Sequence, residues 1–364
     1  HFRVSSTNIA ALTATEPASP ADPLTFTMPT GPCASDASAA DFNLGTPDGN
    51  TAVVLESGGA VILNPVLNEE FSGTTIPSGW AEEVWDGQAG ASATYSGEQV
   101  TADGVHVYTT GTFGPGTALE FSATYTPGNF QNIGFTNDAG FNNPWVVIGR
   151  GSAADNNIYA RTSDNQSAVL GTDLLNAPHK YKIKWLSGTN TFEFYVDDAL
   201  VATPSVTQAV STAMNVQISD YPAGGLALSV DWVRIGPYAA SGSFTSRVFD
   251  AGTQKTWDAA AWSADLPANT GVSIFTRNGD TPTPDGTWTT FSQVAASGNP
   301  AGGTSRYIQY RADLSTTDPA STPVFRSMAI ECLEPVEDLT PPVISNIVAT
   351  PAPDGLSAVV TWQT

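Results

Sequence analysis

Short runs of alternating apolar and polar residues recur along most of this chain, and they restrict its possible folds more than any other feature. From Glu69 to Tyr238 they follow one another at roughly the 8–12-residue spacing of antiparallel sandwiches, separated by glycine, proline, asparagine and aspartate. Examples are Val105–Thr110, Ala118–Tyr125, Trp145–Gly149, Tyr181–Leu186, Thr191–Val196 and Ala227–Ile235. Because side chains alternate between the two faces of a strand, the pattern predicts an all-β chain.

The composition agrees with this fold class and excludes several classes of function. Of the 364 residues, 33 are glycine and 26 are proline, only 13% are charged, and the formal net charge is −22. A long helical protein would be richer in alanine, leucine, glutamate and lysine. Nucleic acids and anionic lipids both call for a basic surface, and no apolar run reaches the ~18 residues of a membrane helix. We therefore expect no nucleic-acid partner and no membrane insertion.

Changes in composition divide the chain into four parts. Residues 1–64 are low in charge and form a strand-containing segment, in which Thr51–Leu63 has the pattern of a hairpin. Residues 65–239 and 240–334 predict two antiparallel β-sandwiches in tandem, a larger one and a smaller one. Residues 335–364 hold a proline-stiffened linker and two strand-like runs. The predicted architecture is two sandwiches with partial strand segments at both ends.

The two cysteines, Cys33 and Cys332, lie near opposite ends of the chain. In an exported protein they could form a disulfide that brings the N-terminal segment onto the last strand of a later domain; two unrelated thiols are the alternative. The chain opens on His1 without a basic and apolar leader, which we interpret as a processed piece of a longer precursor. A secreted or cell-surface location is expected.

Several segments carry a resemblance to a known fold family. Pro178–Trp185, followed by Phe192–Val201, resembles the paired strands of concanavalin A-like jelly rolls, which include laminarinase-type glycoside hydrolases, LamG-like modules and related lectins. Leu67–Phe71 looks like the opening strand of that fold and Leu228–Ile235 like its closing strand. The resemblance covers residues 65–239 and implies a jelly-roll domain there.

The catalytic motif of the hydrolase members of this family is missing. Those members carry a Glu-x-Asp-x-x-Glu strand, which places two carboxylates on one face of the sheet. The run in the corresponding place, Asn143–Arg150, contains no acid. The departure favours a binding or structural module over an enzyme.

The family resemblance also implies a calcium site. In jelly rolls of this type an acid of the opening strand and the aspartate of the closing strand often share one Ca²⁺. Glu69, Glu70 and Asp231 stand in the matching positions, and half of the net charge, −11, falls on residues 65–239. Ca²⁺ prefers six to eight oxygen ligands. The alternative is that these acids are solvated surface groups.

The later parts of the chain carry weaker resemblances. Ser246–Gly252, Thr276–Trp288 and Ser305–Arg311 resemble lines of an accessory β-sandwich of large secreted bacterial proteins, reminiscent of discoidin-like carbohydrate-binding sandwiches. The runs Pro341–Ile347 and Ala358–Thr364 resemble the start of a fibronectin type III or similar immunoglobulin-like domain.

A sugar site would need exposed aromatic rings, on which the C–H face of a pyranose can stack, and amides or carboxylates for its hydroxyls. The loop from Thr136 to Pro144 and the residue after it supply Asn137, Asp138, Phe141, Asn142 and Trp145, and Trp85 is a further aromatic candidate earlier in the domain. The alternative for each tryptophan is a place in an ordinary sandwich core.

Two functions follow from these observations. The first is a calcium-stabilised, lectin-like module that binds a polysaccharide or cell-surface glycan without catalysis. The second is a structural adhesin, stalk or filament subunit that binds copies of itself by strand complementation, with Phe2–Ala11 as the donor strand.

Overall fold

The structure is a computed structural model that describes residues 13–14, 26–27, 32–151, 155–202, 206–333, 345–351 and 358–363. Within these ranges the chain is built from antiparallel sheets, which confirms the predicted all-β class. The four-residue helix α1 (Ala39–Phe42) and the 3-10 turn η1 (Glu56–Gly58) are the helical elements there. None of the helices in these ranges is long and apolar enough to cross a membrane.

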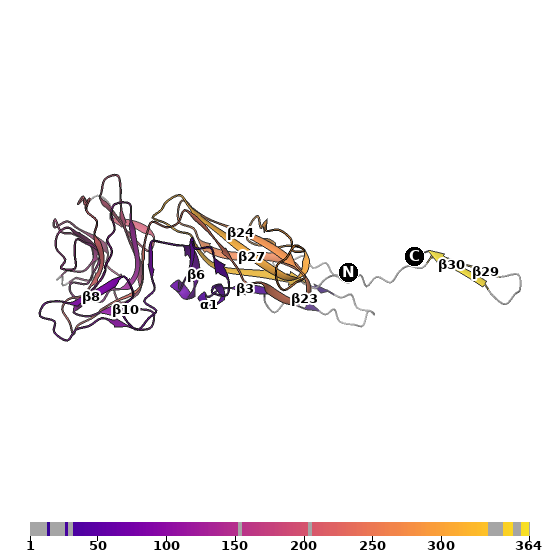
Figure 1. Ribbon diagram of the computed structural model, residues 1–364, viewed down its shortest axis with the longest axis horizontal. Helices are drawn as coiled ribbons and strands as arrows, with labels where there is room; N and C mark the ends of the chain where they lie inside the picture. The colour runs from indigo at the N-terminus through magenta and orange to yellow at the C-terminus, as the bar shows by residue number, and fades with distance from the viewer. Residues whose placement is uncertain are drawn as a thin grey trace.

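Two facing sheets form a sandwich in the middle of the chain, at one end of the molecule in Figure 1. The first sheet has the order β19-β18-β17-β12-β21-β10-β9, and β7 also pairs with β21; the second has the order β16-β15-β14-β13-β20-β11-β8. The strands of the first sheet are β7 (Leu67–Glu69), β9 (Thr94–Tyr95), β10 (Val100–Ala102), β12 (Ala118–Thr124), β17 (His179–Trp185), β18 (Phe192–Val196), β19 (Ala199–Ala202) and β21 (Leu228–Ile235). Those of the second are β8 (Trp80–Val84), β11 (Val105–Thr109), β13 (Asn132–Thr136), β14 (Trp145–Gly149), β15 (Ile158–Thr162), β16 (Ser167–Gly171) and β20 (Asn215–Ser219).

The core of this sandwich follows from strand alternation. In β12, Leu119 and Phe121 point inward, whereas Glu120 and Ser122 lie on the outer face of the first sheet. In β13, Ile133 and Phe135 point inward in the same way. The two-layer sandwich that we expected between residues 65 and 239 is therefore present, with an aromatic and aliphatic interior.

A second body of strands lies beside the sandwich (Figure 1). Its main path is β25-β24-β27-β23-β28-β6-β5, and its buried side chains form a separate core that includes Phe42, Trp257, Tyr310 and Phe325. Its strands are β3 (Ala34–Asp36), β4 (Thr46–Pro47), β5 (Thr51–Val54), β6 (Ala60–Leu63), β22 (Ser241–Thr245), β23 (Phe249–Asp265), β24 (Thr270–Gly279), β25 (Ser292–Gln293), β26 (Asn299–Pro300), β27 (Thr304–Thr316) and β28 (Val324–Leu333).

Strands from both sides of the sandwich segment contribute to this second body. The expected hairpin before residue 64 forms from β5 and β6, and β6 and β3 then pair with β28, near the other end of the chain. The sandwich is thus inserted into the second body, entering through β7 and leaving through β21, which pair with each other. The sequence-based division into 1–64 and 240–334 does not take this pairing into account, because strand partners distant in sequence leave no local pattern.

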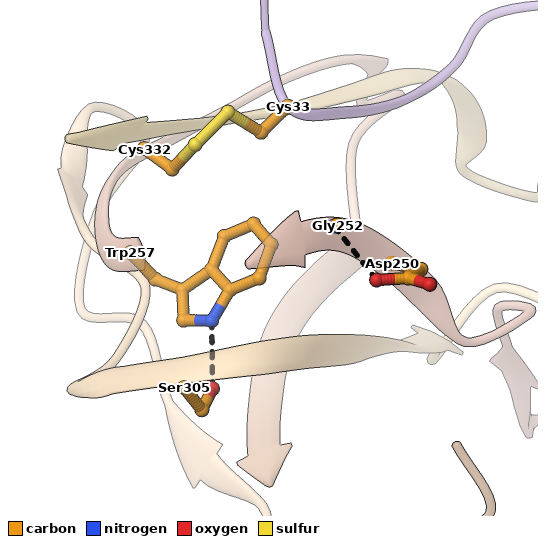
Figure 2. The surroundings of a disulfide bond; sticks show 6 residues. All are labelled: Cys33, Asp250, Gly252, Trp257, Ser305 and Cys332. Carbon is orange, nitrogen blue, oxygen red and sulfur yellow. Dashed lines mark hydrogen bonds between the residues drawn. A yellow bond between two sulfur atoms is a disulfide. The ribbon is translucent and has the colours of Figure 1, made fainter. Parts of the chain in front are cut away.

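The disulfide between Cys33 and Cys332 is present, as expected. Cys332 lies on β28 opposite Trp257 of β23, so the bond ties the residue before β3 to the strand with which β3 pairs. Figure 2 shows the Trp257 ring beneath the disulfide, where its Nε1 donates a hydrogen bond to Ser305 Oγ at 2.8 Å.

Two short pairs of strands complete the described chain. β1 (Thr13–Ala14) pairs with β2 (Phe26–Thr27), and β29 (Ser345–Pro351) pairs with β30 (Ala358–Gln363). The predicted donor strand Phe2–Ala11 lies outside the described residues, as does the predicted linker, residues 335–342.

The outer face of the first sheet joins the sandwich to the second body through charged pairs. On β17, Lys182 pairs with Glu120 and donates to the carbonyl oxygen of Ala320 at 3.1 Å. Lys184 Nζ lies 2.9 Å from Asp318 Oδ2. Each lysine therefore reaches a loop of the second body, which fixes the two bodies relative to each other.

Candidate functional site

The outer face of the second sheet carries a polar and aromatic surface. Because Val105, Val107, Val216 and Ile218 point into the core, their alternate neighbours on β11 and β20 must face outward. These outward-facing residues are His106, Tyr108, Asn215, Gln217 and Ser219. His106 lies directly opposite Ser219, and Tyr108 lies opposite Gln217, so these side chains form rows across the sheet.

A pocket of about 270 Å³ opens at one end of this surface. Four of its lining residues are aromatic and two are small polar residues: Trp85, Phe130, Phe141, Tyr221, Asn132 and Ser219. Trp85 follows β8, Asn132 begins β13 and Ser219 ends β20, while the other three rings come from loops. The sheet therefore supplies the floor and the loops supply most of the aromatic walls.

The Trp85 ring is positioned by a stacked imidazole and by a hydrogen bond. Its ring stacks on His106 with the ring centroids 4.2 Å apart, and its Nε1 donates to Ser219 Oγ at 3.2 Å. His106 Nδ1 lies 2.7 Å from Gln217 Nε2. Burial lowers the pKa of His106, and the nearby Glu83 only partly opposes the shift, so the imidazole is neutral at pH 7. The Trp85 indole therefore stacks on a neutral, buried imidazole.

The loop from Asn137 to Pro144 places Phe141 beside Trp85. The two ring centroids lie 6.3 Å apart. Asn142 Nδ2 donates to both carboxylate oxygens of Asp138, at 3.2 and 3.0 Å, and Asn137 N donates to the carbonyl of Pro144. These polar residues therefore shape the loop that carries the aromatic ring.

A buried polar network holds the other two rings. Gln131 follows Phe130, and its Nε2 donates to Thr126 Oγ1 at 2.7 Å and to Asp220 Oδ2 at 2.9 Å. Asp220 precedes Tyr221, whose ring centroid lies 6.1 Å from that of Phe130. The network joins the two loops that carry these rings, so it determines their relative position.

The protonation of Asp220 gives a prediction for the pH dependence of stability. Burial raises its pKa from 3.8 to about 7, although the hydrogen bond from Gln131 acts in the opposite direction. A carboxyl with a higher pKa in the folded state binds its proton more tightly there, so this contribution to stability is lost as the pH rises towards 7. Between about pH 5 and about pH 8 the loss should be about 2.5 kcal/mol.

The Asp220→Asn variant should lack this loss, because the amide keeps an oxygen to accept the Gln131 hydrogen bond and does not titrate. Urea unfolding of both proteins at the two pH values measures the difference. Asp173→Asn, which replaces an exposed carboxylate, is the matched control. An identical pH dependence in the wild type and in Asp220→Asn would contradict the prediction.

The residues proposed from sequence are brought together in part. Trp85 and Phe141 line the pocket, and Trp145 stands next to Phe141 with ring centroids 5.8 Å apart. Asn137, Asp138 and Asn142 are not among the six lining residues, and a ligand role for them stays a prediction. Sequence reasoning missed Phe130, Asn132, Ser219 and Tyr221. Phe130 and Tyr221 each adjoin a Pro- and Gly-containing turn, and that signal could have identified them.

The acids proposed for calcium have other partners. Glu69 Oε1 accepts a hydrogen bond from Phe71 N, and Glu70 Oε1 lies 3.2 Å from Arg234 Nη2. Asp231 accepts from Gln99 Nε2 and Ser122 Oγ, both at 2.7 Å. In the described part of the chain no three His, Cys, Asp or Glu side chains are grouped to hold a metal ion. Glu70 and Asp231 line one pocket, and the guanidinium of Arg234 lies beside Glu70; calcium binding by these acids stays a prediction.

Comparison with solved structures finds partial likenesses. A pseudo beta-1,3-glucanase and immunostimulatory antigen of Mycobacterium tuberculosis is 14% identical, with 47% of this chain and 98% of that chain covered and a TM-score of 0.34. A beta-glucanase of Bacillus licheniformis is 17% identical, with 50% and 99% covered and a TM-score of 0.33. A lichenase from a mouse hindgut metagenome is 17% identical, with 46% and 97% covered and a TM-score of 0.35. No protein-family model and no curated protein matches the chain. The strand pairing described above, and not these likenesses, establishes the two-sheet sandwich.

Proposed function

We propose that the sandwich binds a glycan without cleaving it, and that the aromatic pocket on the second sheet is the binding site. The observation that carries the proposal is the meeting of Trp85, Phe130, Phe141 and Tyr221, from four separate segments, around one pocket. Exposed or half-exposed rings gathered in this way supply surfaces on which the C–H face of a sugar can stack.

The polar groups beside the rings suit a neutral sugar. Asn132 and Ser219 also line the pocket, but both already accept hydrogen bonds, from Arg161 and Trp85, so they leave only one or two donors for a sugar hydroxyl. The pocket-lining set contains no carboxylate and no basic residue. A disulfide-bonded protein of this kind suits an oxidising, extracellular setting, where polysaccharides and cell-surface glycans are found.

The face of β14 supports a binding role over hydrolysis. Val146 and Ile148 point into the core, so Trp145, Val147 and Gly149 alternate to the outer face, and none of them is an acid. A glycosidase needs a pair of carboxylates on either side of the scissile bond. Incubation with β-glucans should release no reducing sugar above a blank, and release would overturn the non-catalytic role.

Replacing Trp85 by alanine should weaken glycan binding about tenfold or more, because ring stacking is lost and the partly buried contact area shrinks. An oligosaccharide array identifies a ligand for the wild-type protein, and calorimetric titration with that ligand measures the loss. Trp262→Ala, which removes a half-buried tryptophan from the second body, is the control and should bind normally. Absence of array binding by the wild type, or full binding by Trp85→Ala, would overturn the proposed site.

Repeating the titration after EDTA treatment tests the calcium prediction, and a measurement of self-assembly tests the structural role. A lower affinity or melting temperature after EDTA treatment, restored by added Ca²⁺, would support the calcium prediction. Concentration-dependent self-assembly without glycan binding would favour the adhesin or filament function.

A further inference from the structure

We propose that the aromatic pocket selects a neutral sugar residue that carries a methyl group and places that methyl between the rings. The proposal deepens the glycan-binding function above and rests on it. Two common kinds of sugar offer this chemistry: 6-deoxyhexoses, with a methyl on the ring, and N-acetylhexosamines, with an acetamido methyl.

The first reason is that few hydrogen-bonding groups face the pocket. Of the polar groups in its lining, the Trp85 indole N–H and the Ser219 hydroxyl are bonded to each other. Asn132 Oδ1 accepts a bond from Arg161 Nη1 at 3.3 Å, and Asn132 and Ser219 are both buried. A fully hydroxylated sugar placed between the four rings would therefore leave hydroxyls without partners, which weakens its binding.

The second reason is size. At about 270 Å³ the pocket is smaller than the ~300 Å³ at the lower end of drug-sized ligand sites. It therefore suits one sugar residue, or a substituent of that residue, and not a length of polysaccharide chain. A methyl group in such a place contacts aromatic carbon on several sides.

The third reason is that the walls are preformed. Phe130 and Phe141 have φ angles of 55° and 59°, in the left-handed region that bulky residues seldom adopt. The Gln131 network holds the first loop, and Gln217 Nε2 donates to the carbonyl of Ala139 at 2.9 Å to hold the second. Strained conformations of this kind persist where the surroundings fix them, often at ligand clamps.

The lining of the pocket offers no cation to an acidic sugar. Its six residues include no basic side chain, and Arg161, which lies next to Asn132, already donates to that amide and lies over the Trp145 ring. The surrounding residues 65–239 carry seventeen acids against six bases, which also disfavours a uronic acid. The selected residue is therefore both methyl-bearing and uncharged.

Competition between matched sugars tests the proposal. The wild-type protein is bound to its array ligand, and two pairs of free sugars compete: L-fucose against L-galactose, which differ at one hydroxyl, and N-acetylglucosamine against N-formylglucosamine, which differ at one methyl. In one pair or the other, the methyl-bearing member should compete at least about fourfold better, because its partner either places a hydroxyl among the rings or leaves a methyl-sized space unfilled. The first pair identifies a ring methyl as the source, and the second an acetamido methyl.

The remaining outcomes distinguish a failure of the methyl pocket from a failure of glycan binding. If each parent sugar competes as well as its methyl-bearing partner, or if none of the four competes although the array ligand binds, the methyl pocket is wrong while glycan binding stands. If the wild type binds no glycan at all, the proposed function itself fails.

A variant separates the pocket wall from the rest of the site. Phe141→Asn should retain the fold, because asparagine tolerates positive φ, and should abolish the fourfold preference. Leu200→Asn changes an exposed apolar residue on β19 of the other sheet and should keep the preference. A Phe141→Asn protein that unfolds at the wild-type temperature and still prefers the methyl-bearing sugar would overturn the proposal.

Discussion

Replacing Arg234 by methionine should lower the free energy of unfolding by about 3–5 kcal/mol. The Arg234 side chain is 1% exposed and lies between the sandwich and the second body. Its Nη1 is 2.6 Å from Glu56 Oε2 of η1, and its Nη2 is 3.2 Å from Glu70 Oε1. The guanidinium also lies 4.0 Å above the Trp232 ring. Methionine fills much of the space but leaves two half-buried carboxylates without this cation, of which Glu56 keeps another cationic partner, Arg326.

The matched control is Arg306→Met. Arg306 forms a similar pair with Asp250, with its Nε 2.8 Å from Oδ1, but both side chains are more than 40% exposed. Exposed pairs contribute about 0–1 kcal/mol, so this variant should unfold near the wild-type urea midpoint. Equal losses in the two variants would show that burial between the bodies does not matter.

Removing the disulfide by Cys33→Ser together with Cys332→Ser should destabilise the second body by about 4 kcal/mol. The bond closes a loop with a sequence separation of 299, and most of its effect comes from restricting the unfolded chain. The sandwich lies inside that loop. While it stays folded it contributes little chain entropy, which keeps the expected effect near the value for a shorter loop.

Thermal unfolding followed by calorimetry tests this expectation. In the double variant the transition of the second body should move to lower temperature, whereas glycan binding by the sandwich at 25 °C, a condition chosen below both transitions, should stay unchanged. An unchanged transition, or loss of glycan binding without unfolding, would contradict it.

Part of the candidate site was accessible from sequence and part was not. Trp85 and Phe141 were found because each stands among turn and polar residues that leave an aromatic ring exposed. Phe130 and Tyr221 stand beside similar turns, but their meeting could not be predicted, because nothing local in the sequence shows that the loops after β12 and β20 lie together. For Asp231, the resemblance to jelly rolls implied a metal ligand, which stays a prediction; the structure shows hydrogen bonds from Gln99 and Ser122 to its carboxylate.

The sequence by itself determined that this protein is all-β and acidic, that its two cysteines could pair, and that it contains no Glu-x-Asp-x-x-Glu motif in the run Asn143–Arg150. These properties are local or compositional: alternation, turn residues, charge and motif spacing can be read along the chain. Only the tertiary structure decided that the sandwich is inserted between β6 and β22, that Arg234 is buried between two bodies, and that four rings form one pocket. Each of these depends on contacts between residues far apart in sequence, which are selected by the packing of complete sheets and leave no pattern along the chain.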